Sequence, residues 1–562
     1  MISLTKQIIR SLAVYSVGKL SSLYHFFFPV SLTEAEKLFI EENKAFWKEY
    51  SNGGTCAKYV LIEHRKHAVI YLSNAAFGSI VAYAKNLRPL FIINTHKKTV
   101  QRQILESYPN ATFVYSNSWR YLLSNVKAWF EARKIHRRLK TPEELLKLRI
   151  DDMPVGDTIY DAVLSRGYAT IQRIDRKVFE VLYAFLKFRC VIKDIIRRYH
   201  IEVAVVSQLM GFKGGTIAKY LLKNGIEILN RSGSHTICIR KYRTLREIGN
   251  DIRAPLREYF TAMMNNDDGT VRQAAEEYLE QRLGGGLVRI DAAQAFHREK
   301  KIFTDRRSFC ADYDLDPSKP VVFVMLHAFN DCPHWNYPRK MLYLDYYQWF
   351  MHTLEIVKTV RSANWIFKEH PTQRFYPTKD LDVGAVMKQV NCSHIGFIDG
   401  QANFNTCSLR YTAHALVTGT GTAGLEFSTH GIPCILVGEG SYSGFGFTIE
   451  PQDLEEYIEC LRNIDQMSPL SDEQIKAAKI MSYFYFHMIE SENFYFCPRF
   501  EGDELLEWNQ RYSEILWKRG AADFQDPQHA EKMRKQIPSL VDFICDDSRI
   551  QSVNLTRYAF LK

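Results

Sequence analysis

A loop of alternating threonine and glycine is the segment of the sequence best suited to hold a ligand. It runs from residue 418 to 424, directly after an apolar run and directly before a helix expected to begin near Leu425. Backbone N–H groups at the start of a helix favour phosphate, and glycines let the backbone approach it closely. A tight turn is the alternative, and the pattern is neither a Walker A motif nor G-x-G-x-x-G. The residues expected to bind a phosphorylated ligand are Thr418, Gly419, Thr420, Gly421 and Thr422.

Two side chains close to this loop extend the predicted site. Glu426 lies one turn into the following helix, where its carboxylate can accept hydrogen bonds from ribose hydroxyls, although a solvent-facing glutamate is also consistent with the pattern. Tyr442 lies in the glycine-rich segment 438 to 446, which follows the next strand. Flexible backbone beside aromatic rings can cradle a base or a sugar.

A His-Pro pair follows another strand of the same predicted sheet. His370 and Pro371 come after Lys368, about fifty residues before the threonine and glycine loop. Proline fixes the local backbone, and imidazole can donate a hydrogen bond to a phosphate or leaving group. The carboxyl ends of parallel strands share one sheet edge, so these residues are expected to bind the same ligand as the loop.

Two more loops are predicted to line the opposite side of the ligand. The segment 327 to 334 follows the first strand of this sheet, and 207 to 215 follows a strand in the first half of the chain. Each loop can contact a sugar or an acceptor. For the segment 327 to 334, a capped turn before the next helix is the alternative. The candidate residues are His327, Asp331, His334, Gln208 and Lys213.

Two carboxylates four residues apart are the candidates for the chemical step. Asp157 and Asp161 lie on a predicted helix start after a loop at 151 to 154. Glycosyl transfer, a reaction that such a site could perform, needs a carboxylate as general base or as nucleophile. Asp157 is the first choice and Asp161 the second, although a helix N-cap explains Asp157 nearly as well.

The elements that position these residues alternate between apolar strands and helices. Such alternation predicts an α/β protein with two Rossmann-like, doubly wound domains that face a cleft, and with additional N- and C-terminal helices. The expected divisions are an N-terminal amphipathic helical region (1–54), an acceptor-side domain (55–242), a helical linker (243–300), a nucleotide-sugar-binding domain (301–474) and C-terminal helices packing on the first domain (475–562). A charged helical insertion is expected over residues 118 to 147.

Composition excludes several classes of function. The 11 cysteines are scattered singly, which argues against a zinc site or disulfide framework and for a reducing compartment. The net charge of +10 favours an anionic partner, but no nucleic-acid-binding motif accompanies it, so nucleic acid is not expected as a target. The basic amphipathic stretch 2 to 32 is either a helix docked on the protein or a peripheral anchor to an anionic membrane.

Two acidic motifs are set aside. Asp312-Tyr313-Asp314 looks like the metal-binding D-x-D motif of GT-A transferases, but it precedes a strand and is followed by Pro317. Asp267-Asp268-Gly269 sits in a polar helical linker rather than after a strand. No metal site is therefore predicted.

The second half of the chain resembles the capsule and surface-polysaccharide transferases that use CMP-Kdo, and more remotely the CMP-sialic acid transferases. The matching segments are His370-Pro371, residues 420 to 427, residues 431 to 433 and residues 442 to 448, in the same order. The resemblance covers roughly residues 320 to 450 and extends only faintly to 156 through 161.

This resemblance implies a GT-B glycosyltransferase that transfers Kdo, without a metal cofactor, from CMP-Kdo to a growing lipid-linked oligosaccharide in capsule or lipopolysaccharide assembly. The expected location is the cytoplasmic face of the inner membrane, with peripheral attachment. A UDP-sugar-using GT-B enzyme or epimerase, a polyol-phosphate transferase of teichoic-acid type, and a non-catalytic assembly or export protein are the alternatives. The donor-binding residues carried over are those of the His-Pro and threonine-glycine segments.

Overall fold

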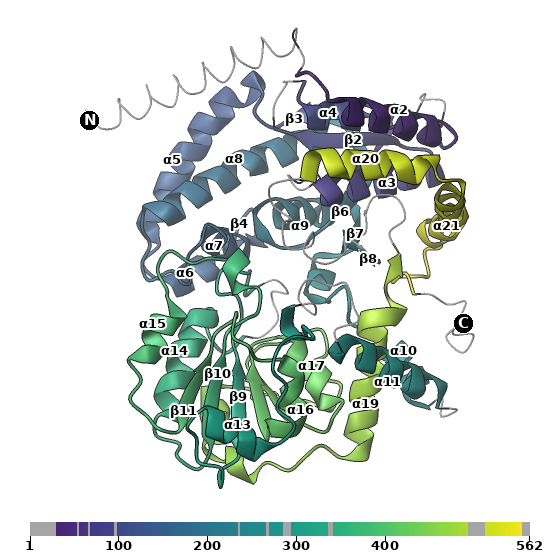
Figure 1. Cartoon of the computed structure of the whole chain (residues 1–562). Helices are drawn as coiled ribbons and strands as arrows, with labels where there is room; N and C mark the ends of the chain where they lie inside the picture. The colour runs from purple at the N-terminus through teal and green to yellow at the C-terminus, as the bar shows by residue number, and fades with distance from the viewer. Residues whose placement is uncertain are drawn as a thin grey trace.

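The computed structural model contains two large β-sheets, one mainly and one entirely parallel, and each is covered by helices on both faces (Figure 1). It describes residues 28, 30–52, 56–63, 65, 68–94, 98–233, 236–265, 269–284, 294–334, 341–492 and 512–553. Most of the basic stretch 2 to 32, and the acidic pair Asp267-Asp268, lie outside the described residues. The prediction of an α/β protein with two Rossmann-like domains is confirmed by the sheet topology.

The first sheet has the strand order β14-β8-β7-β6-β1-β2-β3. The five strands from β7 to β3 pair in parallel, and β8 and β14 add antiparallel pairs at one edge. The strands are β1 (Lys58–Ile62), β2 (Arg88–Ile93), β3 (Thr112–Tyr115), β6 (His200–Val206), β7 (Glu227–Ser232), β8 (Thr236–Tyr242) and β14 (Ser491–Glu492). The order reverses at β1, because β2 and β3 lie on one side of it and β6 and β7 on the other.

Alternate residues of the central strands supply two separate cores. In β1, Val60 and Ile62 face one core, whereas Leu61 faces the other. Burial on both faces explains why these strands are continuous apolar runs rather than alternating ones. The first core is closed by α2 (Glu34–Lys48), α3 (Ala68–Ala84), α4 (Val100–Leu105), α20 (Tyr512–Gln525) and α21 (Pro527–Cys545). The second is closed by α5 (Leu122–Arg138), α6 (Pro142–Leu146), α7 (Gly156–Leu164), α8 (Arg176–Arg198) and α9 (Thr216–Lys223).

The second sheet is entirely parallel, with the order β11-β10-β9-β12-β13. Its strands are β9 (Val321–Met325), β10 (Asn364–Lys368), β11 (Ile395–Ile398), β12 (Ala415–Thr418) and β13 (Cys434–Leu436). One face is covered by α14 (Tyr346–Val357), α15 (Val383–Lys388) and α18 (Leu454–Arg462). The other is covered by α10 (Arg257–Asn265), α11 (Thr270–Leu283), α13 (Arg306–Asp312), α16 (Leu409–Thr412), α17 (Thr422–Ser428) and α19 (Asp472–Tyr483).

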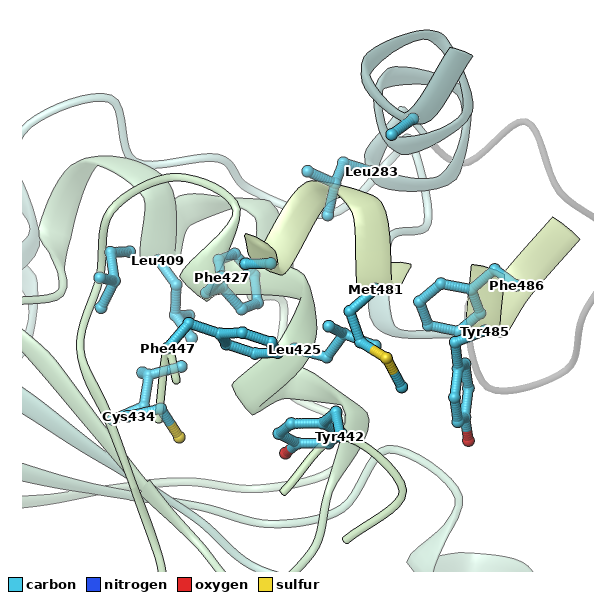
Figure 2. Close-up of a cluster of buried hydrophobic side chains, with 14 of the residues drawn as sticks. Leu283, Leu409, Leu425, Phe427, Cys434, Tyr442, Phe447, Met481, Tyr485 and Phe486 are labelled. Atoms are coloured by element: carbon cyan, nitrogen blue, oxygen red, sulfur yellow. The ribbon is translucent and has the colours of Figure 1, made fainter. Parts of the chain in front are cut away.

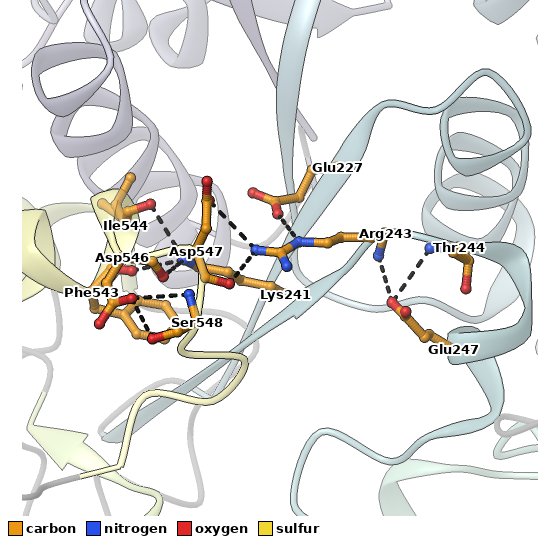
Figure 3. A network of polar contacts seen from close by, with 10 residues as sticks. All are labelled: Glu227, Lys241, Arg243, Thr244, Glu247, Phe543, Ile544, Asp546, Asp547 and Ser548. Atoms are coloured by element: carbon orange, nitrogen blue, oxygen red, sulfur yellow. Dashed lines mark hydrogen bonds and ion pairs between the residues drawn. The ribbon is translucent and has the colours of Figure 1, made fainter. Parts of the chain in front are cut away.

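The chain crosses back to the first sheet after α19. There, a lysine of the first sheet caps the carboxyl end of α21. The crossing delivers β14 to the edge strand β8, and α20 and α21 then pack near α2 and α3. The ammonium group of Lys241 on β8 donates hydrogen bonds to the carbonyls of Phe543, Ile544 and Asp546 at the end of α21, at 2.8, 3.3 and 2.7 Å (Figure 3). A helix leaves its last carbonyls without intrahelical partners, so this lysine satisfies them and favours the negative end of the helix dipole.

The alternation of apolar strands and helices is present in both sheets, whereas β7, β8, β14 and the short antiparallel pair of β4 (Arg149–Ile150) and β5 (Met153–Pro154) were not predicted from the sequence. The insertion expected over 118 to 147 comprises a 3₁₀ turn (Trp119–Tyr121), α5 and α6. Within the described ranges, no helix combines the length and the apolar character needed to cross a bilayer.

Candidate functional site

The threonine and glycine loop lies at the topological switch point of the second sheet. β9 has β10 on one side and β12 on the other, so the helices that follow these strands diverge there. Open parallel sheets bind ligands at the carboxyl ends of such strands. His327 follows β9, Lys368 ends β10, and Thr418 ends β12, so three predicted segments meet at this point.

His327 connects the β9 and β12 loops directly. Its Nε2 atom accepts a hydrogen bond from the backbone N–H of Thr420 at 3.0 Å and lies 3.4 Å from the hydroxyl of Thr418. The imidazole stacks on the ring of Tyr346, with centroids 4.2 Å apart and an interplanar angle of 7°. Burial, together with the nearby His370, lowers the pKa of His327 to about 3. The imidazole is therefore neutral near pH 7, with its proton on Nδ1.

The glycines of the loop are required by packing against these rings. A Cβ atom on Gly419 would lie 2.9 Å from the Tyr346 ring and 3.0 Å from His327. A Cβ on Gly421 would lie 2.9 Å from the Thr418 hydroxyl. Close approach of the loop to its own supporting side chains thus explains Gly419 and Gly421 without a ligand, and Thr422 begins α17 immediately afterwards.

Tyr442 and Glu426 lie behind the loop, in the protein interior. Tyr442 is buried among the apolar side chains around Leu425 (Figure 2), and its hydroxyl donates to the carbonyl of Gly421 at 2.5 Å. The carboxylate of Glu426 accepts from the guanidinium of Arg282 on α11 at 2.6 and 2.7 Å. Both side chains therefore support the loop and α17 from the side that faces the hydrophobic core.

The β10 loop presents a buried ammonium and a histidine. Lys368 is 5% exposed, and no hydrogen bond or ion pair from any described residue reaches its ammonium group. Burial, together with the nearby Lys300, lowers the pKa of Lys368 to about 8. His370 Nδ1 accepts from the hydroxyl and the backbone N–H of Thr372 at 2.8 and 3.2 Å, so its proton lies on Nε2. Pro371 follows and is half-buried.

The two predicted carboxylates of α7 have different partners. Asp157 is buried, and both of its oxygens lie 2.5 Å from the ammonium of Lys219 on α9. Asp161 is also buried, and its Oδ1 lies 2.6 Å from Nδ1 of His334, in the loop after β9. Asp161 therefore faces the second domain, whereas Asp157 is engaged within the first.

The Asp161 and His334 pair is held in a contact between the two domains. Next to it, the hydroxyl of Tyr160 donates to Oδ2 of Asp345, the N-cap of α14, at 2.7 Å. Burial alone lowers the pKa of His334, but the Asp161 carboxylate outweighs it, so the pKa is raised. Nε2 of His334 is buried, and no described residue forms a hydrogen bond with it.

The first sheet has its own switch point between β1 and β6, and the predicted loop 207 to 215 lies there. Glu63, directly after β1, accepts from the backbone N–H and the hydroxyl of Ser207 at 2.9 and 2.7 Å. Gln208 accepts a hydrogen bond from Arg65. Lys213, in a π-helical turn (Gly211–Gly215), donates to Asn94 at 3.3 Å.

The β9 loop joins these segments across the domain interface, because its His334 lies 2.6 Å from Asp161 of α7 and its His327 accepts from Thr420 of the β12 loop at 3.0 Å. Asp331 and Asp161 both raise the pKa of Tyr346, after the larger effect of burial. Burial and Asp161 likewise raise the pKa of Asp331. Because Tyr346 also stacks on His327, the α7 carboxylate and the β9 and β12 loops belong to one site. Tyr442 contacts the β12 loop from the core side, whereas Glu426 pairs with Arg282 and Asp157 pairs with Lys219 away from it.

Several residues of this site were not predicted from the sequence. Glu63 and Arg65 follow a predicted strand, so the same edge rule that selected Gln208 would have found them. Tyr346 could not be found by this rule, because it does not follow a strand and its ring reaches the site from the first turn of α14. Lys219 and Arg282 are identified only by their buried carboxylate partners.

Comparison with known proteins gives only distant similarities. No family model matches the sequence, and no curated protein matches it. Similar solved structures include a KpsC from Thermosulfurimonas dismutans, a beta Kdo 2,4 transferase, with 13% identity and a TM-score of 0.31 over 50% of this chain and 79% of that one. The wall teichoic acid polymerase TagF has 9% identity and a TM-score of 0.20 over 94% and 98%. The UDP-GlcNAc 2-epimerase from Methanocaldococcus jannaschii has 13% identity and a TM-score of 0.22 over 75% and 97%. Similarities this weak carry no conclusion about activity.

Proposed function

We propose that the chain is a GT-B glycosyltransferase of surface-glycan assembly that transfers Kdo from CMP-Kdo to a lipid-linked oligosaccharide at the cytoplasmic face of the inner membrane. The donor would bind at the switch point of the second sheet, against Lys368, His370, Pro371 and residues 418 to 422. The choice of CMP-Kdo rests on the sequence resemblance of residues 420 to 427 and 442 to 448.

The buried ammonium of Lys368 is the observation that carries the donor site. An isolated buried charge costs several kcal/mol unless it is paired and hydrogen-bonded. Lys368 receives neither from the described residues, and the nearby Lys300 increases the cost. A phosphate of the donor would supply the missing negative charge. The Nε2–H of His370, whose Nδ1 is occupied by Thr372, would donate to the same group.

The Asp161 and His334 pair supports the acceptor half of the reaction. Asp161 accepts a hydrogen bond from Nδ1–H of His334, which leaves the lone pair of the neutral ring on Nε2, where it can take a proton. In the proposed step the acceptor oxygen attacks the anomeric carbon, and its proton passes to Nε2 of His334. The bond from that carbon to the CMP phosphate breaks, and the phosphate leaves with the electron pair. Asp157 would act as a structural ion pair with Lys219.

A donor panel tests the nucleotide and the sugar. The purified chain is incubated with a lipid-linked acceptor and with CMP-Kdo, CMP-sialic acid, UDP-sugars or a CDP-polyol in turn. Release of CMP and extension of the acceptor with CMP-Kdo alone are expected. Turnover of a UDP-sugar or CDP-polyol instead would replace the Kdo assignment, and absence of turnover with every donor would favour a non-catalytic assembly protein.

Lys368→Met is expected to weaken CMP binding by about 10- to 100-fold, because a hydrogen bond to a charged group contributes about 1.5–3 kcal/mol. The wild-type affinity should also depend on pH. The Lys368 ammonium is charged below its pKa of about 8 and loses its charge above it. CMP affinity should therefore fall above pH 8, by up to about tenfold per pH unit. Calorimetric titration from pH 6.5 to 9.5 measures both effects.

Lys388→Met is the matched control for this titration. Lys388 is exposed at the end of α15 in the same domain. Its replacement should leave the affinity and its fall above pH 8 unchanged. A folded Lys368→Met protein that binds CMP as tightly as the wild type would remove Lys368 from the donor site.

A further inference from the structure

Helix α5 presents an apolar stripe to solvent on the outer side of the first domain. Its inner face packs on α8 through Ala128 and Ala132, which are buried (Figure 1). Its outer face carries Leu123, Val126 and Phe130, which are 77%, 50% and 60% exposed. The intervals of three and four residues place these three side chains on one side of the helix. We call them the α5 stripe.

The stripe lies between exposed cationic side chains. Lys127, Lys134, Arg137 and Arg138 are exposed on α5, and no ion pair within the described part of the chain involves them. The one acidic residue of the helix, Glu131, is bound through both oxygens by Arg189 of α8, at 2.8 and 2.6 Å. The outer surface of α5 is therefore both apolar and positively charged.

We infer that the α5 stripe and its flanking cations form a docking surface for an anionic lipid bilayer. A helix of this type lies in the interface plane, with apolar side chains among the acyl chains and lysine or arginine at the headgroups. Anionic headgroups add electrostatic attraction for each basic residue near the surface. This surface is separate from the donor site and does not depend on the transferase proposal.

The chemistry of the surface disfavours two other occupants. A second copy docking through the same face would bring two sets of cations together, because a two-fold interface pairs a surface with itself. Nucleic acid would match the charge but not the exposed Leu123 and Phe130, since its backbone is contacted by cations and polar groups. An anionic bilayer matches both the charge and the apolar stripe.

Co-sedimentation of the full chain with lipid vesicles tests the inference. Phosphatidylcholine vesicles are compared with vesicles containing one quarter phosphatidylglycerol. The wild type should bind the anionic vesicles at least about tenfold more tightly, and salt should weaken that binding because it screens the charges. Leu123→Gln/Phe130→Gln and Lys127→Glu/Lys134→Glu should each lower anionic binding by about tenfold or more.

The double variant Ile302→Gln/Leu454→Gln is the matched control. These two side chains are exposed to 47% and 40%, on or beside the second domain, and their replacement should leave vesicle binding unchanged. Circular dichroism confirms that each variant is folded. The inference is overturned if the α5 variants bind like the wild type, if neutral and anionic vesicles bind equally, or if sedimentation shows that the α5 variants convert a dimer into a monomer. Vesicle binding is measured without donor or acceptor, so failure of the transferase proposal would leave this result intact.

Discussion

Asp161→Asn is expected to lower kcat by about 10³- to 10⁴-fold, with little change in the KM for the donor. The replacement keeps the size of the side chain, so the contact with His334 across the domains can persist. An amide can donate to Nδ1 of His334, which would move the imidazole proton to Nε2 and prevent it from accepting the proton of the acceptor. Loss of the orienting carboxylate in such pairs has effects of this size. Steady-state kinetics with CMP release measures it.

The pH profile separates this effect from a simple loss of structure. Below its raised pKa, His334 is protonated and cannot act as a base, so kcat/KM of the wild type should rise with pH through a value above 6.5. The Asp161 carboxylate contributes most to that shift, ahead of Asp157 and Asp345. In the Asp161→Asn variant the rise should therefore move to lower pH.

Asp345→Asn serves as the comparison, since Asp345 accepts from Tyr160 across the same interface and raises the pKa of His334 less than Asp161 does, and no hydrogen bond between described residues joins it to His334. It should reduce kcat far less than Asp161→Asn. An equal loss in both variants would reduce Asp161 to a domain contact. If instead His334→Ala accumulates a covalent adduct of the sugar on Asp161, seen by intact mass, then Asp161 is the nucleophile and His334 is not the base.

The strands of the second sheet could be placed from the sequence because they are buried on both faces. A central parallel strand is a short continuous apolar run, and residues 321 to 325, 364 to 368 and 415 to 418 show this clearly. The loops at their carboxyl ends then share one sheet edge by topology, so the meeting of His327 with Thr420 follows from strand order. The strand β8 was less evident, because it is antiparallel and carries the buried Arg240 and Lys241.

The roles of individual side chains in the site could not be read in the same way. Asp157 and Asp161 are one helical turn apart and carry identical chemistry. Their difference arises from Lys219 and His334, which lie 62 and 173 residues away. Likewise, the glycines at 419 and 421 suggested close approach of a ligand, whereas the structure shows that close approach of Tyr346 and His327 already requires the first of them. The pattern of apolar runs identifies the edge of a sheet. Which side chain at that edge can meet a ligand depends on tertiary packing, which the pattern does not give.

Lys219→Met is expected to destabilise the first domain by about 3–5 kcal/mol, because it leaves the buried Asp157 without its cation. The Lys219 ammonium lies 2.5 Å from both carboxylate oxygens and 3.0 Å from the hydroxyl of Thr158. Both partners are under 10% exposed, so water cannot replace the lost interaction. Urea unfolding, with hydrogen exchange of the α7 and α9 amides, measures the loss in the domain concerned.

The double variant Asp157→Asn/Lys219→Met should recover most of that stability, since a neutral amide beside a methionine leaves no buried charge. Recovery of the stability together with near-normal turnover would establish the pair as structural and leave Asp161 as the carboxylate that acts in the reaction. The opposite result, a stable double variant whose turnover has fallen by orders of magnitude, would mean that Asp157 acts on the substrate and that the ion pair with Lys219 opens during the reaction. Because α7 carries both carboxylates on successive turns, only this comparison distinguishes a helix that presents one acid from a helix that presents two.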